Sequence, residues 1–92
     1  MARFEIQEAE MAVMGQQNLS PEIYFQLGIS YSTGRGVDAD MIAAHKWFNL
    51  AAAQGKSEAA QYRQDVAREM SSADIAEAQR QAREHLAMMT RH

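Results

Sequence analysis

Residues 27–55, with the sequence LGISYSTGRGVDADMIAAHKWFNLAAAQG, contain two segments with helical apolar spacing on either side of a short turn, TGRGV at 33–37. Glycine takes left-handed backbone angles at no steric cost, so the two glycines of this turn can end one helix and reverse the chain. Small residues occupy the positions where the two helices would touch. The stretch therefore predicts an antiparallel helix pair that packs closely and stacks on a second pair.

The first helix of this pair is expected to run from Pro21 to about Ser32. Ser20 is a favourable N-cap, and proline at the first helical position sacrifices no hydrogen bond, because its missing N–H needs no partner there. The expected core stripe consists of Ile23, Leu27 and Tyr31, flanked by Phe25.

The second helix begins at Asp38 or Asp40, because a carboxylate is favourable at the positive end of the helix dipole, and Gly55 ends it. Its expected inner face consists of Met41 or Ile42, then Ala44, Trp47, Phe48, Ala51 and Ala52. Val37 places an apolar side chain in the turn before it. Both helices of the pair thus have an apolar face and a defined start and end.

Three further helices are expected outside this pair, over residues 57–70, from Ser71 or Ser72 to about Met89, and over residues 4–14. Ser71 followed by Asp74 has the spacing of a capping box. The expected core positions are Ala59, Tyr62, Val66 and Met70 on the third helix, and Ile75, Ala78, Ala82, Leu86 and Met89 on the fourth. No segment alternates with period two, so the sequence predicts an all-α chain of four to five helices, with antiparallel neighbours.

Length and charge restrict the possible classes of protein. Ninety-two residues form one domain, and without cysteine no disulfide can support it. The net charge is −3, and the sequence shows no basic face that could bind phosphate groups. Nucleic acid is therefore not expected as a partner. No apolar run approaches the ~20 residues that span a bilayer, so membrane insertion is not expected. Glutamates near the N-terminus do not fit a secretory signal, and we expect a cytoplasmic protein.

The order and spacing of twelve residues resemble a Sel1-like repeat, which is a tetratricopeptide-related helix pair. These residues are Leu27, Gly28, Tyr31, Gly34, Gly36, Val37, Asp40, Ala44, Trp47, Ala51, Ala52 and Gly55. Residues 68–80 look like the tail that follows such repeats in small bacterial proteins, and residues 9–15 are similar to the end of a preceding, truncated repeat.

The resemblance implies a short right-handed α-solenoid in a single domain, 1–92. Residues 1–19 would form an N-terminal helical segment, residues 20–55 the repeat, and residues 56–92 a capping helix pair. It further implies a non-catalytic protein–protein interaction module, acting as an adaptor or as an accessory subunit of a larger complex. Gln81 and His85 occupy positions that are commonly apolar in such tails, which favours a partner or a dimer.

No set of residues predicts catalysis, a metal site or a cofactor. His45, His85 and His92 lack metal-ligand spacing and are interpreted as surface residues, while Asp38 and Asp40 are explained by helix capping. The turn glycines lack the lysine and the preceding strand of a phosphate loop. Glu77, Arg80 and Glu84 are spaced for ion pairs along a solvated helix face, or alternatively along a docking stripe.

A repeat solenoid binds its partners along the concave face, which the first helix of each pair forms. Residues of the first helix outside its core stripe are therefore the candidate protein-binding residues, and they are Tyr24, Gln26, Ser30 and, in the turn, Arg35. Two alternatives stay open. One is a self-associating structural homo-oligomer, such as a homodimer. The other is a small helical ligand-binding module whose cavity is lined by Met11, Met14, Met41, Met70, Met88 and Met89.

Overall fold

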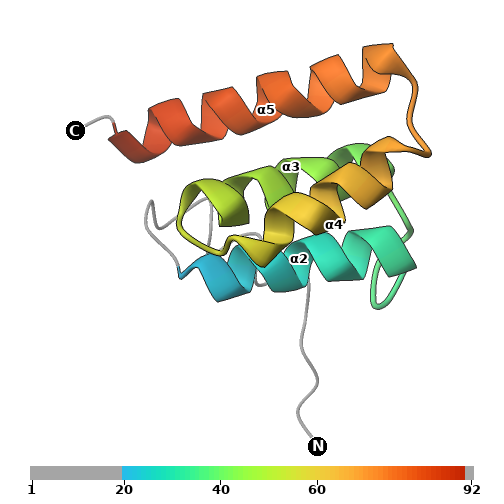
Figure 1. Cartoon of the computed structure of the whole chain (residues 1–92), viewed down its shortest axis with the longest axis horizontal. Helices are drawn as coiled ribbons and strands as arrows, with labels where there is room; N and C mark the ends of the chain where they lie inside the picture. The colour runs from blue at the N-terminus through green and yellow to red at the C-terminus, as the bar shows by residue number, and fades with distance from the viewer. Residues whose placement is uncertain (1–19, 91–92) are drawn as a thin grey trace, which may run out of the picture.

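The computed structural model describes residues 20–90. This part of the chain contains four α-helices and no strand, which confirms the all-α class (Figure 1). The helices are α2 (Pro21–Thr33), α3 (Met41–Ala53), α4 (Glu58–Ala67) and α5 (Ser72–Thr90). The helix predicted over residues 4–14 lies outside the described residues.

The turn after α2 is held by backbone hydrogen bonds. Gly34 has a φ of 75°, and its N–H and that of Arg35 both donate to the carbonyl oxygen of Ser30, at 2.8 and 3.0 Å. Gly36 has a φ of 81°, so both glycines take the left-handed conformation predicted for them. The N–H of Asp40 then donates to the carbonyl oxygen of Tyr31 at 2.9 Å, which ties the end of the turn back to α2.

The side chain of Asp40 caps α3. Its Oδ1 accepts a hydrogen bond from the N–H of Ala43 at 3.1 Å, so Asp40 rather than Asp38 begins the second helix. The helix ends at Ala53, and Gly55 follows with a φ of 112°.

The other two helices begin and end close to the predicted positions. α4 ends at Ala67, three residues before the predicted end at Met70, because the turn into α5 starts there. The Oγ of Ser71 accepts a hydrogen bond from the N–H of Asp74 at 3.1 Å, so Ser71 caps α5 as predicted.

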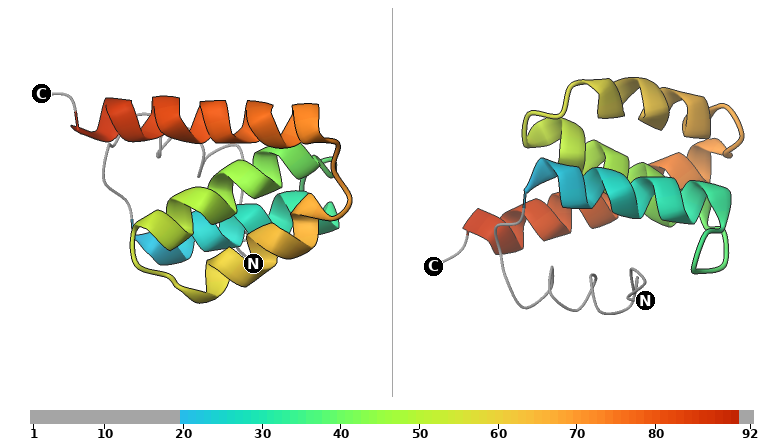
Figure 2. Two further views of the ribbon diagram at one scale, coloured as in Figure 1. Left: turned by 45° about the horizontal axis from the view of Figure 1, so that its top comes forward. Right: turned by 90° about the horizontal axis from the view of Figure 1, so that it is seen from below.

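Helix α3 lies at the centre and packs against α2, α4 and α5. Figures 1 and 2 show α5 lying across α3, with α2 and α4 on the other side. α4 and α5 therefore pack mainly on α3 rather than on each other. The core forms around α3. It consists of buried side chains of α3 together with buried side chains of α2, α4 and α5.

The buried face of α2 differs from the predicted stripe. Leu27 is buried as expected, but Ile23 and Tyr31 are only half-buried, and the predicted face is wrong to that extent. The residues of α2 that are buried are Tyr24, Phe25, Leu27, Gly28 and Ser30. The physical reason is Gly28: the ring of Phe48 lies so close that a Cβ there would be 2.5 Å from two ring carbons. The contact with α3 therefore centres on the glycine.

The inner face of α3 is largely as predicted, since Ala44, Trp47, Phe48 and Ala51 are buried and Ala52 is half-buried. His45 and Leu50 are also buried, because α3 is covered by helices on several sides. A one-sided amphipathic pattern underestimates how much of such a central helix is enclosed.

Candidate protein-binding grooves

Two shallow grooves flank α3 in the described part of the chain. The first, which we call the α4 groove, has a volume of about 230 Å³ and lies between α4, α3 and the end of α2. Its lining residues are Ser32, Met41, Phe48, Tyr62, Asp65, Val66 and Glu69. The second, the α5 groove, has a volume of about 300 Å³ and is lined by Lys46, Trp47, Arg80, Gln81, Glu84, His85 and Met88.

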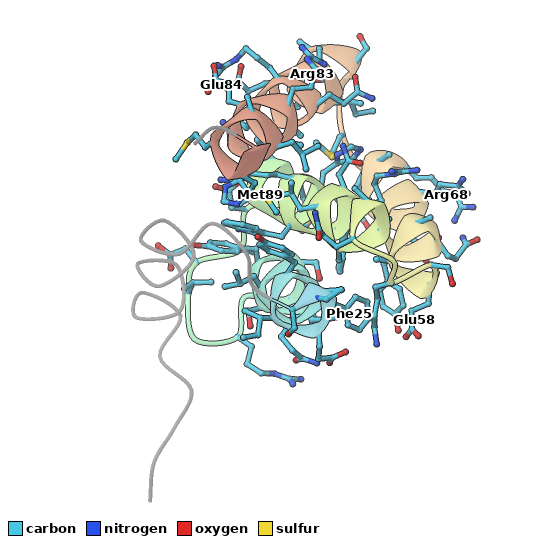
Figure 3. All side chains as sticks on the ribbon, turned by 90° about the vertical axis from the view of Figure 1, so that its left-hand side faces the viewer. Phe25, Glu58, Arg68, Arg83, Glu84 and Met89 are labelled. Atoms are coloured by element: carbon cyan, nitrogen blue, oxygen red, sulfur yellow. The ribbon has the colours of Figure 1, made fainter. Side chains whose placement is uncertain are left out.

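The α4 groove has an aromatic wall. Tyr62 is 41% exposed, although it was predicted to be a core residue, because it lies at the edge of the contact between α4 and its neighbours. Its ring is 5.0 Å from that of Phe25, edge to face, and 5.5 Å from that of Phe48. Figure 3 shows Phe25 between α2 and α4. Tyr62 is thus a half-exposed ring held in place by two buried ones.

The charged residues of the α4 groove are both acids. Asp65 Oδ1 accepts hydrogen bonds from Arg68 and Gln61, each at 3.0 Å. Glu69 lies two residues beyond the end of α4 at Ala67 and has no ion-pair partner among residues 20–90. The lining contains no lysine or arginine, and Arg68 is on the outer side of α4 (Figure 3). The groove therefore combines apolar side chains with carboxylates.

The cations of the α5 groove already have contacts within the chain. Lys46 Nζ lies 4.2 Å from the centre of the Trp47 ring. Arg80 forms ion pairs with Glu77 and Glu84, as predicted from their spacing. The hydrogen bond from Arg80, followed by that from Gln81, lowers the pKa of Glu77 to about 2. The charged residues of this groove therefore already interact within the chain. Met88 lies at the edge of the groove and is 44% exposed.

A buried polar and aromatic cluster lies beneath the α5 groove. The hydroxyl oxygen of Tyr24 is 3.5 Å from Nε2 of His85 and 3.5 Å from the sulfur of Met89. The Tyr24 and Trp47 rings are stacked, with centroids 5.8 Å apart, and both meet His85 edge to face. Figure 3 shows Met89 turned from α5 toward α3. This cluster joins α5 to the α2–α3 pair.

The interpretation of His45 and His85 as surface residues is wrong, because both are buried. Burial lowers the pKa of each ring, and a nearby cation, Arg63 for His45 and Lys46 for His85, adds to the effect. The Nδ1 of His45 is buried and has no hydrogen-bond partner among residues 20–90, so a proton there would find no acceptor in this part of the chain. Between residues 20 and 90, no three His, Cys, Asp or Glu side chains gather as metal ligands would.

The structure places the four predicted binding residues in two different environments. Gln26 and Arg35 are exposed, and Gln26 Nε2 donates to Glu22 at 2.7 Å. Tyr24 is completely buried and Ser30 nearly so, which corrects the expectation that they lie outside the core. The reason for Tyr24 is that α5 covers it through His85 and Met89, a contact between residues 61 and 65 positions apart.

Residues from three helices form the α4 groove, and none of the four predicted residues lines it. Tyr62 was the detectable signal, since it is the only aromatic residue in the polar segment EAAQYRQD of α4.

The methionines do not gather in one cavity within residues 20–90. Met41 lines the α4 groove and Met88 the α5 groove, whereas Met70 and Met89 are half-buried against the core. Met11 and Met14 lie outside the described residues. The described methionines thus divide between two open grooves and the core.

None of the described helices combines the length and the apolar character needed to cross a membrane. Comparisons with protein-family models, with curated proteins and with solved structures gave no significant match.

Proposed function

We propose that this chain is a non-catalytic protein–protein interaction module, acting as an adaptor or accessory subunit, and that the α4 groove is its contact surface. The observation that carries this proposal is Tyr62, a half-exposed aromatic ring fixed by Phe25 and Phe48 at the wall of an apolar groove. Tyrosine supplies a large contact area at a low entropic cost, and aromatic residues dominate the energetics of protein interfaces. A ring already immobilised by its neighbours loses little further freedom on binding.

The dimensions of the groove favour a protein over a small molecule as the ligand. Sites that enclose small ligands usually measure roughly 300–1,000 Å³ and bury most of the ligand. The α4 groove, at about 230 Å³, is smaller and open. It can accept one or two side chains from a partner helix, whose other contacts would spread over the surrounding surface.

In this proposal the α2–α3 pair is a Sel1-like unit, and α4 and α5 close a short solenoid. The support is local: a two-glycine turn with left-handed angles, an Asp40 cap, and a close helix contact at Gly28. Each occupies a position that the resemblance assigns to the repeat.

Co-purification from the native host under mild conditions, followed by calorimetric titration of the identified partner, would test the proposal. Tyr62→Ala should weaken binding by about 30-fold, the equivalent of a 2 kcal/mol hot spot. Met88→Ala is a matched control, because it truncates a similarly exposed apolar side chain in the other groove. Circular dichroism would confirm that both variants fold.

Partner binding that survives Tyr62→Ala unchanged would refute the assignment of the α4 groove. If the chain instead elutes alone with a dimer mass in light scattering, it would be a self-associating structural protein.

A further inference from the structure

We infer that the α4 groove binds a basic amphipathic helix, whose apolar side chain contacts Tyr62 and whose lysine or arginine pairs with Glu69. This inference rests on the proposed function and specifies the chemistry of the partner. It starts from the composition of the lining, in which apolar side chains are accompanied by two carboxylates and by no cation.

Two carboxylates line the groove. Asp65 lies in the last turn of α4, and Glu69 lies in the turn that follows the end of the helix at Ala67. Like charges that line one small groove repel each other. A cation from a partner would relieve that repulsion as well as pair with Glu69.

The groove keeps one carboxylate available. Glu69 is exposed and has no ion pair among the described residues, whereas Asp65 is paired with Arg68 at 3.0 Å. The side chains of that pair are 72% and 53% exposed, so solvent screens it and a partner cation can replace Arg68 at little cost. Glu69 is therefore the primary contact for a cation, and Asp65 a secondary one.

The apolar side chains lie directly beside the acids. Tyr62 and Val66 are on the same helix within one turn of Asp65, while Phe48 and Met41 face them from α3. On a partner helix, an apolar residue and a basic residue three or four positions apart would reach both features at once. Methionine adapts its shape readily, so Met41 allows more than one kind of apolar side chain.

Charge also argues against the other occupants. A symmetric dimer would place groove against groove, bringing Glu69 of one copy near Glu69 of the other in a chain of net charge −3. Phosphate groups of nucleic acid would be repelled by the same carboxylates. The basic amphipathic helix is the occupant whose charge complements the groove.

A peptide selection would test this inference without knowledge of the native partner. The full chain is immobilised and a display library of random 16-residue peptides is selected against it, in parallel with a Glu69→Lys variant. We expect the wild-type pool to be enriched in peptides with Lys or Arg three or four residues from a large apolar residue. The pool selected on Glu69→Lys should instead carry Asp or Glu at that position.

Binding of an enriched peptide is then measured by fluorescence anisotropy. Glu69→Gln should weaken it about 2- to 5-fold, as expected for an exposed ion pair, and Glu69→Lys more strongly. Higher salt should weaken wild-type binding as well. Glu58→Gln is the matched control: it neutralises an exposed acid in the first turn of α4, outside the groove, and it should change little.

Three results of the peptide experiments would overturn the inference: no enrichment, enrichment without basic residues, or binding insensitive to Glu69→Lys. A native partner that needs Tyr62 but not Glu69 would leave the proposed function intact while refuting the inference. Sedimentation of the full chain addresses a second copy. A dimer abolished by Glu69→Lys would assign the groove to self-association and overturn the inference too.

Discussion

Replacing Gly28 by alanine should destabilise the fold, although alanine is normally the better helix former. A Cβ at residue 28 would lie 2.5 Å from two carbons of the Phe48 ring. Phe48 is completely buried, with the rings of Phe25 and Tyr62 against it, so it cannot turn out of the way. The helices themselves would have to separate.

The magnitude follows from two opposing effects. Overpacking a well-filled core costs about 1–3 kcal/mol, and a contact this short places the cost at the upper end. Replacing glycine by alanine within a helix stabilises the folded state by about 1 kcal/mol, because alanine has the higher helix propensity. We therefore expect Gly28→Ala to lower the unfolding free energy by about 2 kcal/mol, and the melting temperature of a domain this small by about 10 °C.

Urea unfolding followed by the fluorescence of Trp47, the only tryptophan, would measure this change. The same substitution made in a Phe48→Leu background is the control. Leucine removes the ring that the new methyl group would strike, so Gly28→Ala should there be neutral or stabilising. A Gly28→Ala protein as stable as the wild type would refute the close contact between α2 and α3 at this position.

Burial lowers the pKa of His85 and His45 in the folded chain. Below about pH 6.5 the unfolded chain therefore binds more protons than the folded chain, and folding becomes less favourable. The urea midpoint should therefore be constant from pH 8 to pH 7 and fall progressively as the pH drops below about 6.5, less steeply in His85→Gln. Asp40→Ala removes the cap of α3 and should cost about 1 kcal/mol in the same assay; no loss would refute the capping role. Glu77 should titrate near pH 2 by NMR and return toward the ordinary glutamate range in Arg80→Ala, whereas a normal value in the wild type would contradict the observed ion pair.

The helices and their limits were predictable because local interactions determine them. The two turn glycines take left-handed angles, Ser71 caps α5 and Asp40 caps α3, each within a few residues of the group it contacts. The all-α class and the order of the helices followed from the same local signals. Within residues 20–90, only the end of α4 differs noticeably from the prediction, by three residues.

The burial of individual side chains was harder to predict because it depends on distant parts of the chain. Tyr24 is covered by residues of α5 more than sixty positions away, and periodicity within α2 carries no information about that contact. His85 has a polar ring that sequence patterns place at the surface, yet here it packs edge to face against two aromatic rings.

The candidate site also depends on contacts between distant parts of the chain. Val66 was assigned to the core correctly, but the groove beside it is lined by side chains from three helices. Tyr62 is half-exposed because it lies at the edge of the contact between α4 and its neighbours. The acidic character of the α4 groove was visible in the sequence as Asp65 and Glu69, four residues apart. What could not be predicted was that both carboxylates line the same groove as Phe48 and Tyr62.

The central position of α3 has a consequence for the opening motions of the protein. Since α4 and α5 each dock mainly on α3, either can detach while the other remains in place. Amide hydrogens of α3 should then exchange with solvent only when the whole domain unfolds, whereas those of α4 exchange through a smaller, partial opening. A partner bound in the α4 groove would join α4 to α3 and slow that partial exchange. The groove would thus couple binding to the partial opening of α4, and the protection pattern would report occupancy without any label on the partner.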